Sequence, residues 1–242
     1  MEIYMKKQTY LHIIIMLAAV LLAACAPVET AQSSPPAATQ SSEALETPSS
    51  AVPTQTAVPE PDDTAFVRVA DYIPDVIVDL KYATDKNFTG QTIYTFQDAC
   101  LRYGTVKKLS AAADELRGQG YRLLIWDAFR PTSAQWKLWD VCPNAAYVSD
   151  PNKGYSSHSR GNTVDVTLAQ SDGSPVEMPT DFDDFTAHAD RDYSDVAQTP
   201  AQNATLLEKV MKENGFKPYS AEWWHFSDET AYPVEESFVP GA

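Results

Sequence analysis

The sequence predicts an α+β domain in which an antiparallel sheet is flanked by helices. Helix-spaced apolar residues and short β-branched runs are mixed along the chain without a regular strand–helix–strand repeat, which disfavours a parallel, doubly wound sheet. Apolar residues make up 44% of the 242 residues, so a substantial core can form. The chain shows no internal repeat and no glycine-rich phosphate loop. Its length fits one domain with extensions.

The first 25 residues have the composition of an export signal. Lys6 and Lys7 precede the apolar run 13–22, which is short for a membrane span, and small residues lead to Cys25. This pattern resembles a bacterial lipoprotein signal, which implies a lipid on Cys25 that anchors the chain to the cell membrane. An uncleaved anchor and an ordinary secretory signal are the alternatives. Under each of them the rest of the chain is extracytoplasmic.

Residues 26–63 are dominated by Pro, Ser, Thr, Ala and Gln, with no aromatic and no basic residue. Such a segment cannot bury enough apolar surface to offset the entropy of ordering it. We therefore expect a disordered tether, which is either a spacer of selected length or a plain linker. The folded domain is expected over 64–242, with its first core residues near Phe66.

The first half of this domain contains three expected elements and a loop. Residues 75–82 alternate and are rich in Val and Ile, which predicts a strand. Residues 81–94 are polar and contain glycine, which predicts a loop. Helical spacing of apolar residues predicts a helix over 104–118, and the apolar run 121–126 predicts a buried strand.

The second half continues with two helices and two strands. A helix is expected over 131–139, with its proline in the first turn. Residues 163–168 alternate as a strand does. An amphipathic helix is expected over 203–214, closed by Gly215, and the last core strand over 223–226.

The net charge is −15, from 18 basic and 33 acidic residues. This charge opposes binding of the domain to nucleic acid or to an anionic membrane surface. We interpret this charge as serving solubility, with an attraction for cationic ligands as the alternative.

Two cysteines remain once Cys25 is assigned to a lipid. Cys100 and Cys142 form an even pair, which could make one disulfide outside the cytoplasm. Two buried free thiols are equally compatible with the sequence, because it does not show how closely the two α carbons approach.

Candidate metal donors lie in the stretch SSHSRGNTVDVTL. His158 and Asp165 offer an imidazole nitrogen and a carboxylate oxygen, both good zinc donors. We expect Asp165 on the polar face of its strand, with the alternate valines toward the core. Gly161 would let the preceding turn bring His158 back to it. A capped turn and a solvated strand end are the alternative for this pair, and a catalytic zinc site would still need a third ligand.

The block EWWHF supplies candidates for the missing groups. His225 would be the third metal ligand, and Glu222 the carboxylate that takes a proton from water and passes it to the leaving amine. We assign Trp223 and Trp224 to packing around the site. Arg130, in DAFRP, could stabilise an oxyanion, or it could simply pair with a nearby acid.

Four motifs together resemble a known family. KYATDKNFTG, DAFRP, SSHSRG with its following VDVTL, and EWWHF occur in the order found in zinc D-Ala-D-Ala dipeptidases of the VanX type. These belong to a wider family of zinc DD-peptidases that share an α+β core with hedgehog domains. The resemblance runs from about residue 66 to residue 227. It implies a zinc peptidase catalytic domain over 64–242 that holds one Zn²⁺ per chain.

The resemblance also implies roles for individual residues. The family's metal ligands fall on His158, Asp165 and His225, its general base on Glu222, and its transition-state arginine on Arg130.

Two further roles concern the substrate. A Phe-Asp pair that binds the substrate's amino group falls on Phe182 and Asp183, between the acids Asp181 and Asp184. The family's serine that lines the substrate site falls on Ser156.

The chain departs from the family pattern at two positions. Thr163 stands where a small residue such as alanine is usual, which implies a modest change in packing. Pro179 stands where glycine often precedes the Phe-Asp pair, which could shift the loop that carries Asp183. His188 is not expected to be a fourth ligand, because three protein ligands already make an open catalytic site.

The leading hypothesis is hydrolysis of D-Ala-D-Ala to D-alanine by a monomeric catalytic domain that does not bind nucleic acid. The extracytoplasmic location points to dipeptide released during wall turnover. The alternative is a DD-carboxypeptidase or other stem-peptide hydrolase with the same zinc mechanism. A third hypothesis is a wall-binding lipoprotein without turnover, which the intact set of ligands, base and arginine disfavours.

Overall fold

The computed structural model describes residues 59–241. The expected export signal lies outside the described residues, as does the expected tether up to residue 58. The described chain joins the folded domain at Asp63 and Thr64, whose carbonyl oxygens accept hydrogen bonds from Gly104 N and Arg102 Nη1. Within residues 59–241 no helix combines the length and apolarity needed to cross a membrane.

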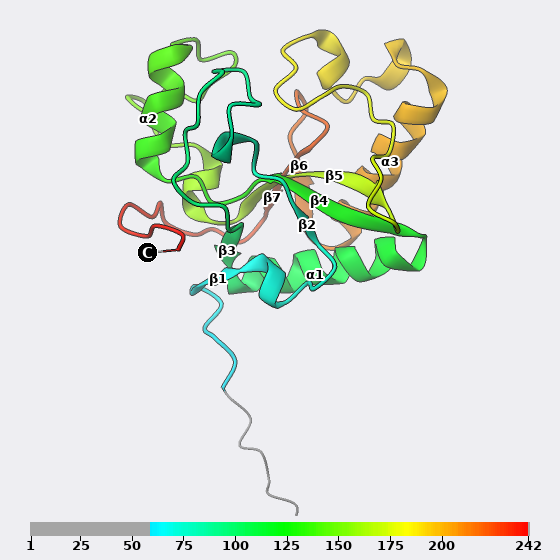
Figure 1. Cartoon of the computed structure of the whole chain (residues 1–242), viewed down its shortest axis with the longest axis horizontal. Coiled ribbons are helices and arrows are strands. Elements are labelled where there is room, and N and C mark those ends of the chain that lie inside the picture. Colours follow the sequence, from blue (N-terminus) through cyan, green and yellow to red (C-terminus); the bar gives the residue numbers. More distant parts are fainter. Residues whose placement is uncertain (1–58, 242) are drawn as a thin grey trace, which may run out of the picture. The chain divides into compact units, whose positions relative to one another are not determined.

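Helices and strands are mixed along the chain (Figure 1). The strands are β1 (Phe66–Arg68), β2 (Ile77–Val78), β3 (Cys100–Arg102), β4 (Tyr121–Asp127), β5 (Thr163–Gln170), β6 (Phe216–Pro218) and β7 (His225–Asp228). The helices are α1 (Tyr103–Gly118), α2 (Thr132–Val141) and α3 (Gln198–Glu213). Short 3-10 turns are η1 (Val69–Asp71), η2 (Lys81–Ala83), η3 (Ser157–Arg160), η4 (Ala187–Ala189) and η5 (Tyr193–Asp195).

The main sheet has five strands in the order β2-β4-β5-β7-β6. All neighbours are antiparallel except β2 and β4, which run parallel. The expectation of an antiparallel sheet is therefore wrong at this edge, although the α+β class is confirmed. The chain between β2 and β4 crosses over through α1, and a crossover of this length returns the chain in the same direction.

The helices cover the sheet unequally. α1 buries Val106, Leu109 and Leu116 against β4 and also packs on α3, whose Leu207 and Val210 are fully buried. α2 and the long loops lie on the opposite side of the sheet from α1 (Figure 1). Both faces of β5 are consequently covered. The alternative of a solvated strand end does not hold, because every residue from 163 to 169 is buried.

Several element boundaries also differ from the prediction. The strand expected over 75–82 is limited to the two residues of β2, because this edge strand pairs only with β4. The last strand begins at His225, two residues later than expected. Helix α3 begins at Gln198, before the expected start at 203. Pro200 falls in its first turn, where the N–H that proline lacks would have no partner within the helix. The short strands β1, β3 and β6 were not predicted.

Both cysteines are free thiols. Cys100 is buried on β3, and this burial raises the pKa of its thiol to about 11. Cys142 is half-buried at the end of α2. Of the two possibilities left by the sequence, the structure therefore has the unpaired thiols.

Candidate active site

The register of the sheet brings three of the polar side chains together. Asp165 on β5 lies directly opposite His225 on β7 and opposite Asp127 at the end of β4. Directly opposed residues in an antiparallel pair project to the same face. A register shift between Ile125 and Asp127 makes the alignment on the β4 side possible. All three side chains thus project to one face of the sheet.

His158 reaches this face from the turn η3. Ser156 caps the turn, and its side chain accepts a hydrogen bond from His158 N. Gly161 ends the turn at φ 75°, where a Cβ would collide with the ring of Phe66. The same turn is tied to the chain after β4, because Ser159 Oγ donates to Arg130 O at 2.8 Å. A glycine is therefore required for the fold to present His158.

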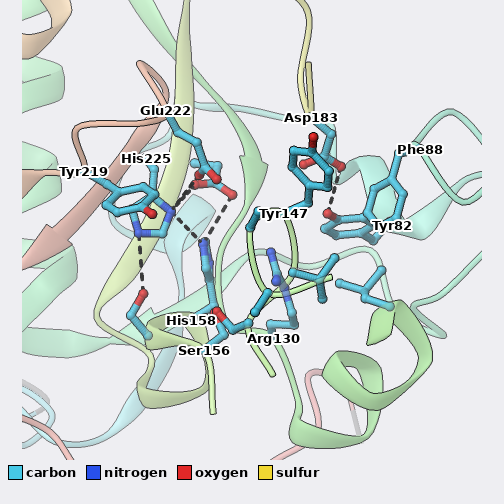
Figure 2. A pocket seen from close by; sticks show the side chains of 17 residues that line it. Tyr82, Phe88, Arg130, Tyr147, Ser156, His158, Asp183, Tyr219, Glu222 and His225 are labelled. Atoms are coloured by element: carbon cyan, nitrogen blue, oxygen red, sulfur yellow. Dashed lines mark hydrogen bonds and ion pairs between the residues drawn. The ribbon is translucent and has the colours of Figure 1, made fainter. Parts of the chain in front are cut away.

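The donor atoms of His158, Asp165 and His225 converge within 4.8 Å of one another. His158 Nε2 lies 3.3 Å from Asp165 Oδ2, and His225 Nδ1 lies 3.0 Å from Asp165 Oδ1 (Figure 2). The two facing ring nitrogens are 3.3 Å apart. Two imidazoles and a carboxylate form a donor set that suits zinc and leaves room for a fourth ligand.

The surroundings of the cluster fit a cation. His158 Nδ1 lies 2.8 Å from Ala128 O, so it can donate there while Nε2 keeps a lone pair for a metal. The buried Asp165 Oδ1 accepts no well-aligned hydrogen bond among the described residues, although His225 Nδ1 lies 3.0 Å away. Burial opposes ionisation of Asp165, but His158 and His225 outweigh it and hold the pKa of this carboxyl well below its ordinary value. A buried anionic oxygen without a donor is costly unless a cation completes it.

Glu222 stands beside the cluster and lines the same cavity. Its Oε2 lies 3.5 Å from His225 Nδ1 (Figure 2). Burial raises the pKa of the Glu222 carboxyl, and the proximity of His225 partly offsets this effect. Glu222 is thus a carboxylate beside, rather than within, the converging donor set.

Arg130 is paired with a nearby acid, and its role toward an oxyanion stays a prediction. Its Nε and Nη2 donate to Asp127 Oδ2 at 3.0 and 2.7 Å, and its Nη1 donates to Gln135 Oε1 at 3.0 Å. Tyr94 donates to the other oxygen of Asp127. Burial alone would lower the pKa of Arg130, but Asp127 outweighs it and the pKa is raised. Arg130 is therefore paired and oriented, and it also lines the cavity.

Asp183 faces the cavity from the loop between β5 and α3 (Figure 2). The hydroxyl of Tyr82 donates to Asp183 Oδ2 at 2.8 Å. Asp183 has a φ of 56°, an uncommon conformation that Asp and Asn tolerate better than most residues. Burial raises the pKa of its carboxyl to about 8. With Pro179 in the sequence, the loop still brings this carboxyl to the site.

The flanking acids behave differently from Asp183. Asp184 accepts a hydrogen bond from Thr186 N, and Asp181 is exposed outside the cavity. Ser156 does line the cavity. His188 lies at the surface, 3.5 Å from Asp195, and is not part of the donor cluster.

The cavity has a volume of about 270 Å³ and opens to the surface. Drug-sized ligands usually occupy pockets of about 300–1,000 Å³, so this cavity suits a small ligand. One end carries Glu222 and the metal donors, and the other carries Asp183. Trp223 and Trp224 do not line the cavity; they are buried and pack with Trp126.

Arg191 supports the segment that carries Glu222 and His225. Its backbone N donates to Ser220 O, its Nε to Tyr219 O at 2.7 Å and its Nη2 to His225 O at 3.1 Å. Its Nη1 pairs with Glu208 of α3 at 3.0 Å. A single side chain therefore ties both ends of this segment to the helix layer.

Sequence reasoning missed several contributors, namely Tyr82, Asp127, Gln135, Arg191 and Tyr219. Tyr82 and Asp127 lie inside the motifs KYATDKNFTG and DAFRP, so those motifs held the signal. At position 163 the hydroxyl of Thr163 is satisfied across the sheet, 2.8 Å from Ser227 Oγ.

Comparison with known proteins gives consistent results. The M15 peptidase family, described as D-ala-D-ala dipeptidase, matches residues 62–240. A D-alanyl-D-alanine dipeptidase of Escherichia coli (strain K12) is 35% identical over 175 residues, which cover 72% of this chain and 90% of the relative. One from Enterococcus faecium is 33% identical over 181 residues, which cover 66% and 90%.

Solved structures with similarity to the chain include VanYB in complex with D-alanine-D-alanine. It has a TM-score of 0.37 and 16% identity over 59% of this chain and 76% of that one. The LdcB LD-carboxypeptidase has a TM-score of 0.39 and 18% identity over 74% and 71%.

Proposed function

The chain belongs to the M15 peptidase family of D-Ala-D-Ala dipeptidases, and from this membership we propose that it hydrolyses free D-Ala-D-Ala to D-alanine in peptidoglycan metabolism. The observation that carries the choice of substrate is the carboxylate of Asp183, which shares a cavity of about 270 Å³ with the metal donors. A positively charged amino group favours the ionised form of this carboxyl, so a dipeptide with a free amino group can pair with it there. A longer peptide has an uncharged amide at that position.

One zinc ion per chain would be held by His158, Asp165 and His225. Zinc supplies Lewis acidity there, which polarises the scissile carbonyl and makes water a better nucleophile at neutral pH. The convergence of the three donor atoms within 4.8 Å of one another, and the contact of His158 Nδ1 with Ala128 O that leaves Nε2 its lone pair, support this assignment.

The remaining chemistry falls to side chains around the donors. Glu222 accepts a proton from the attacking water as the oxygen adds to the scissile carbonyl carbon. When the C–N bond breaks, Glu222 returns the proton to the leaving nitrogen. Arg130 stabilises the negative charge that develops on the carbonyl oxygen, and Asp127 keeps its guanidinium in place. Asp183 holds the substrate ammonium, so that the peptide bond lies between the two ends of the cavity.

Two alternatives remain distinct from this proposal. A DD-carboxypeptidase with the same residues would accept a stem peptide, which the position of Asp183 disfavours. A wall-binding lipoprotein without turnover would not need the base and the arginine beside the donors.

The test is a side-by-side assay of the full-length, zinc-loaded protein. We expect D-alanine release from D-Ala-D-Ala and little from a pentapeptide stem, with loss of activity after chelation and recovery with zinc. Glu222→Gln should keep zinc but lose about 10²–10⁴-fold in kcat, the usual contribution of a general base. The dipeptidase proposal fails if protein with bound zinc releases no D-alanine from the dipeptide.

We also propose that the protein is lipid-anchored through Cys25 and works outside the cytoplasm, at the end of the tether over 26–63. The support is the composition of these segments. In this location the substrate is dipeptide released during wall turnover. Labelled fatty acid should be incorporated into the wild-type chain but not into Cys25→Ser.

A monomeric catalytic domain without affinity for nucleic acid completes the proposal. The acidic net charge of −15 supports the second point. Light scattering tests the first point, and it should give the mass of one chain.

A further inference from the structure

A row of aromatic rings borders the Asp183 end of the cavity. Phe88 packs edge-on against Phe185, with ring centroids 5.4 Å apart, and Phe185 stacks on Tyr147 at 4.5 Å and 26°. We call Phe88, Phe185 and Tyr147 the aromatic rim. Each ring comes from a different loop: 84–99 between η2 and β3, 171–186 after β5, and 142–156 after α2.

The rim is continuous with the residues that hold Asp183. Tyr82, which donates to Asp183 Oδ2, packs edge-on against Phe88 with centroids 6.4 Å apart. Phe185 follows Asp183 by two residues. Phe88 and Tyr147 also line the cavity. The rim therefore stands where a peptide would continue beyond the amino group of a bound dipeptide.

The outer part of the rim is a contact between two loops at the surface. Tyr147 is 46% exposed and Phe185 is 42% exposed, unlike the buried aromatic residues beneath the cavity. The stacking of these two half-exposed rings joins the loops that carry them. Such a contact can also be removed without opening the hydrophobic core.

We propose that the aromatic rim determines substrate length, because it closes the cavity beyond Asp183 and excludes peptides that are extended at the amino end. This inference rests on the proposed dipeptidase function and deepens it. Asp183 recognises the charge of the substrate's amino group. The aromatic rim excludes substrates that carry further atoms beyond this group. Two substrates separate these effects. An N-acylated dipeptide lacks the charged amino group and carries a few extra atoms, so it tests Asp183 and the aromatic rim together. A longer peptide places more atoms against the rim, so it tests the rim more strongly.

The experiment compares kcat/KM for D-Ala-D-Ala with kcat/KM for N-acetyl-D-Ala-D-Ala and for a tripeptide that ends in D-Ala-D-Ala. It uses full-length, zinc-loaded wild type, Tyr147→Ala, Phe185→Ala and the double variant. Trp136→Ala is the matched control, because Trp136 is a comparably exposed aromatic residue on α2, at 39%, and lies outside the cavity. Zinc content and circular dichroism are measured for every variant.

We expect the ratio of extended-peptide to dipeptide kcat/KM to rise at least tenfold in each rim variant and further in the double variant. Trp136→Ala should keep the wild-type ratio. An unchanged ratio in folded, zinc-containing rim variants overturns the proposal, as does an equal rise in Trp136→Ala. If a rim alanine variant does not fold, Phe185→Leu and Tyr147→Leu replace it under the same criteria.

The result also separates this inference from the proposed function. A wild-type protein that cleaves stem peptides but not the dipeptide contradicts the function itself. A wild-type protein that cleaves the dipeptide, with rim variants that keep its selectivity, contradicts only the role of the rim.

Discussion

Asp183→Asn is expected to stabilise the protein while it weakens substrate binding. Burial raises the pKa of the Asp183 carboxyl to about 8 in the folded protein, whereas the unfolded chain ionises it near its ordinary value of about 3.9. Asparagine keeps the shape and carries no charge. It also tolerates the φ of 56° at this position, so the backbone should not confound the comparison.

The sign of the pH dependence follows from proton binding. Between these two pKa values the folded state binds more protons, so Asp183 lowers the free energy of unfolding as pH rises, with the full loss above about pH 8. The gap in pKa sets an upper limit of about 6 kcal/mol. Partial exposure of Asp183 and a bound cation nearby reduce this free energy. We therefore expect Asp183→Asn to raise the free energy of unfolding by about 2 kcal/mol at pH 9, which corresponds to about 4–8 °C in Tm.

The assay is thermal unfolding of zinc-loaded wild type and Asp183→Asn at pH 5.5, 7 and 9, together with dipeptide kinetics. The stability gain should grow with pH, while kcat/KM should fall about 10–100-fold, the usual effect of losing a charge-assisted hydrogen bond. Asp181→Asn removes the same charge from an exposed position on the same loop and serves as control. A gain that is equal at all three pH values, or equal in both variants, would refute the reasoning.

Three further predictions concern groups around the metal donors. Asp127→Asn should release Arg130 and lower kcat about 10–100-fold with a smaller change in KM, and an unchanged kcat would contradict this positioning role. Arg191→Lys should lower zinc affinity about tenfold in chelator competition, because lysine cannot span the backbone carbonyls that arginine joins. Arg122→Lys is the control: it also loses a backbone contact, but it should leave zinc affinity unchanged. Removal of zinc should lower Tm, since a ligand that binds only the folded state stabilises it and Asp165 Oδ1 has no other well-aligned partner among the described residues. An equal Tm would argue against a metal there.

Local patterns were sufficient for the larger elements. The helix expected over 104–118 is α1 at 103–118, and the strand expected over 121–126 is β4 at 121–127. These segments are long enough for their periodicity to be clear. The strands β1, β3 and β6 have three residues each, so they carry no periodic signal and exist because a partner strand pairs with them. The parallel edge at β2 likewise depends on the path of the whole crossover.

The candidate site divides in the same way. His158, Asp165, Glu222 and His225 stood out because donors of the right type occurred in two short blocks, and the structure brings them together. Arg191 gave no such signal. Its contacts to the segment before β7 depend on partners about thirty residues away, and in the sequence it is one charged residue among several acids. The catalytic and ligand roles of His158, Asp165, Glu222 and His225 stay predictions.

The sheet and the loops make different contributions to the candidate site. A one-residue slip of β5 would turn Asp165 away from His225 and would move Val164 and Val166 out of the core. The pairing that buries the valines is therefore the pairing that holds Asp165 opposite His225, so the core fixes the positions of these two donors. Asp183 and the aromatic rim lie on loops, which can change in length and sequence without disturbing this register. Substrate length should accordingly be the easier property to alter, and zinc chemistry the harder one.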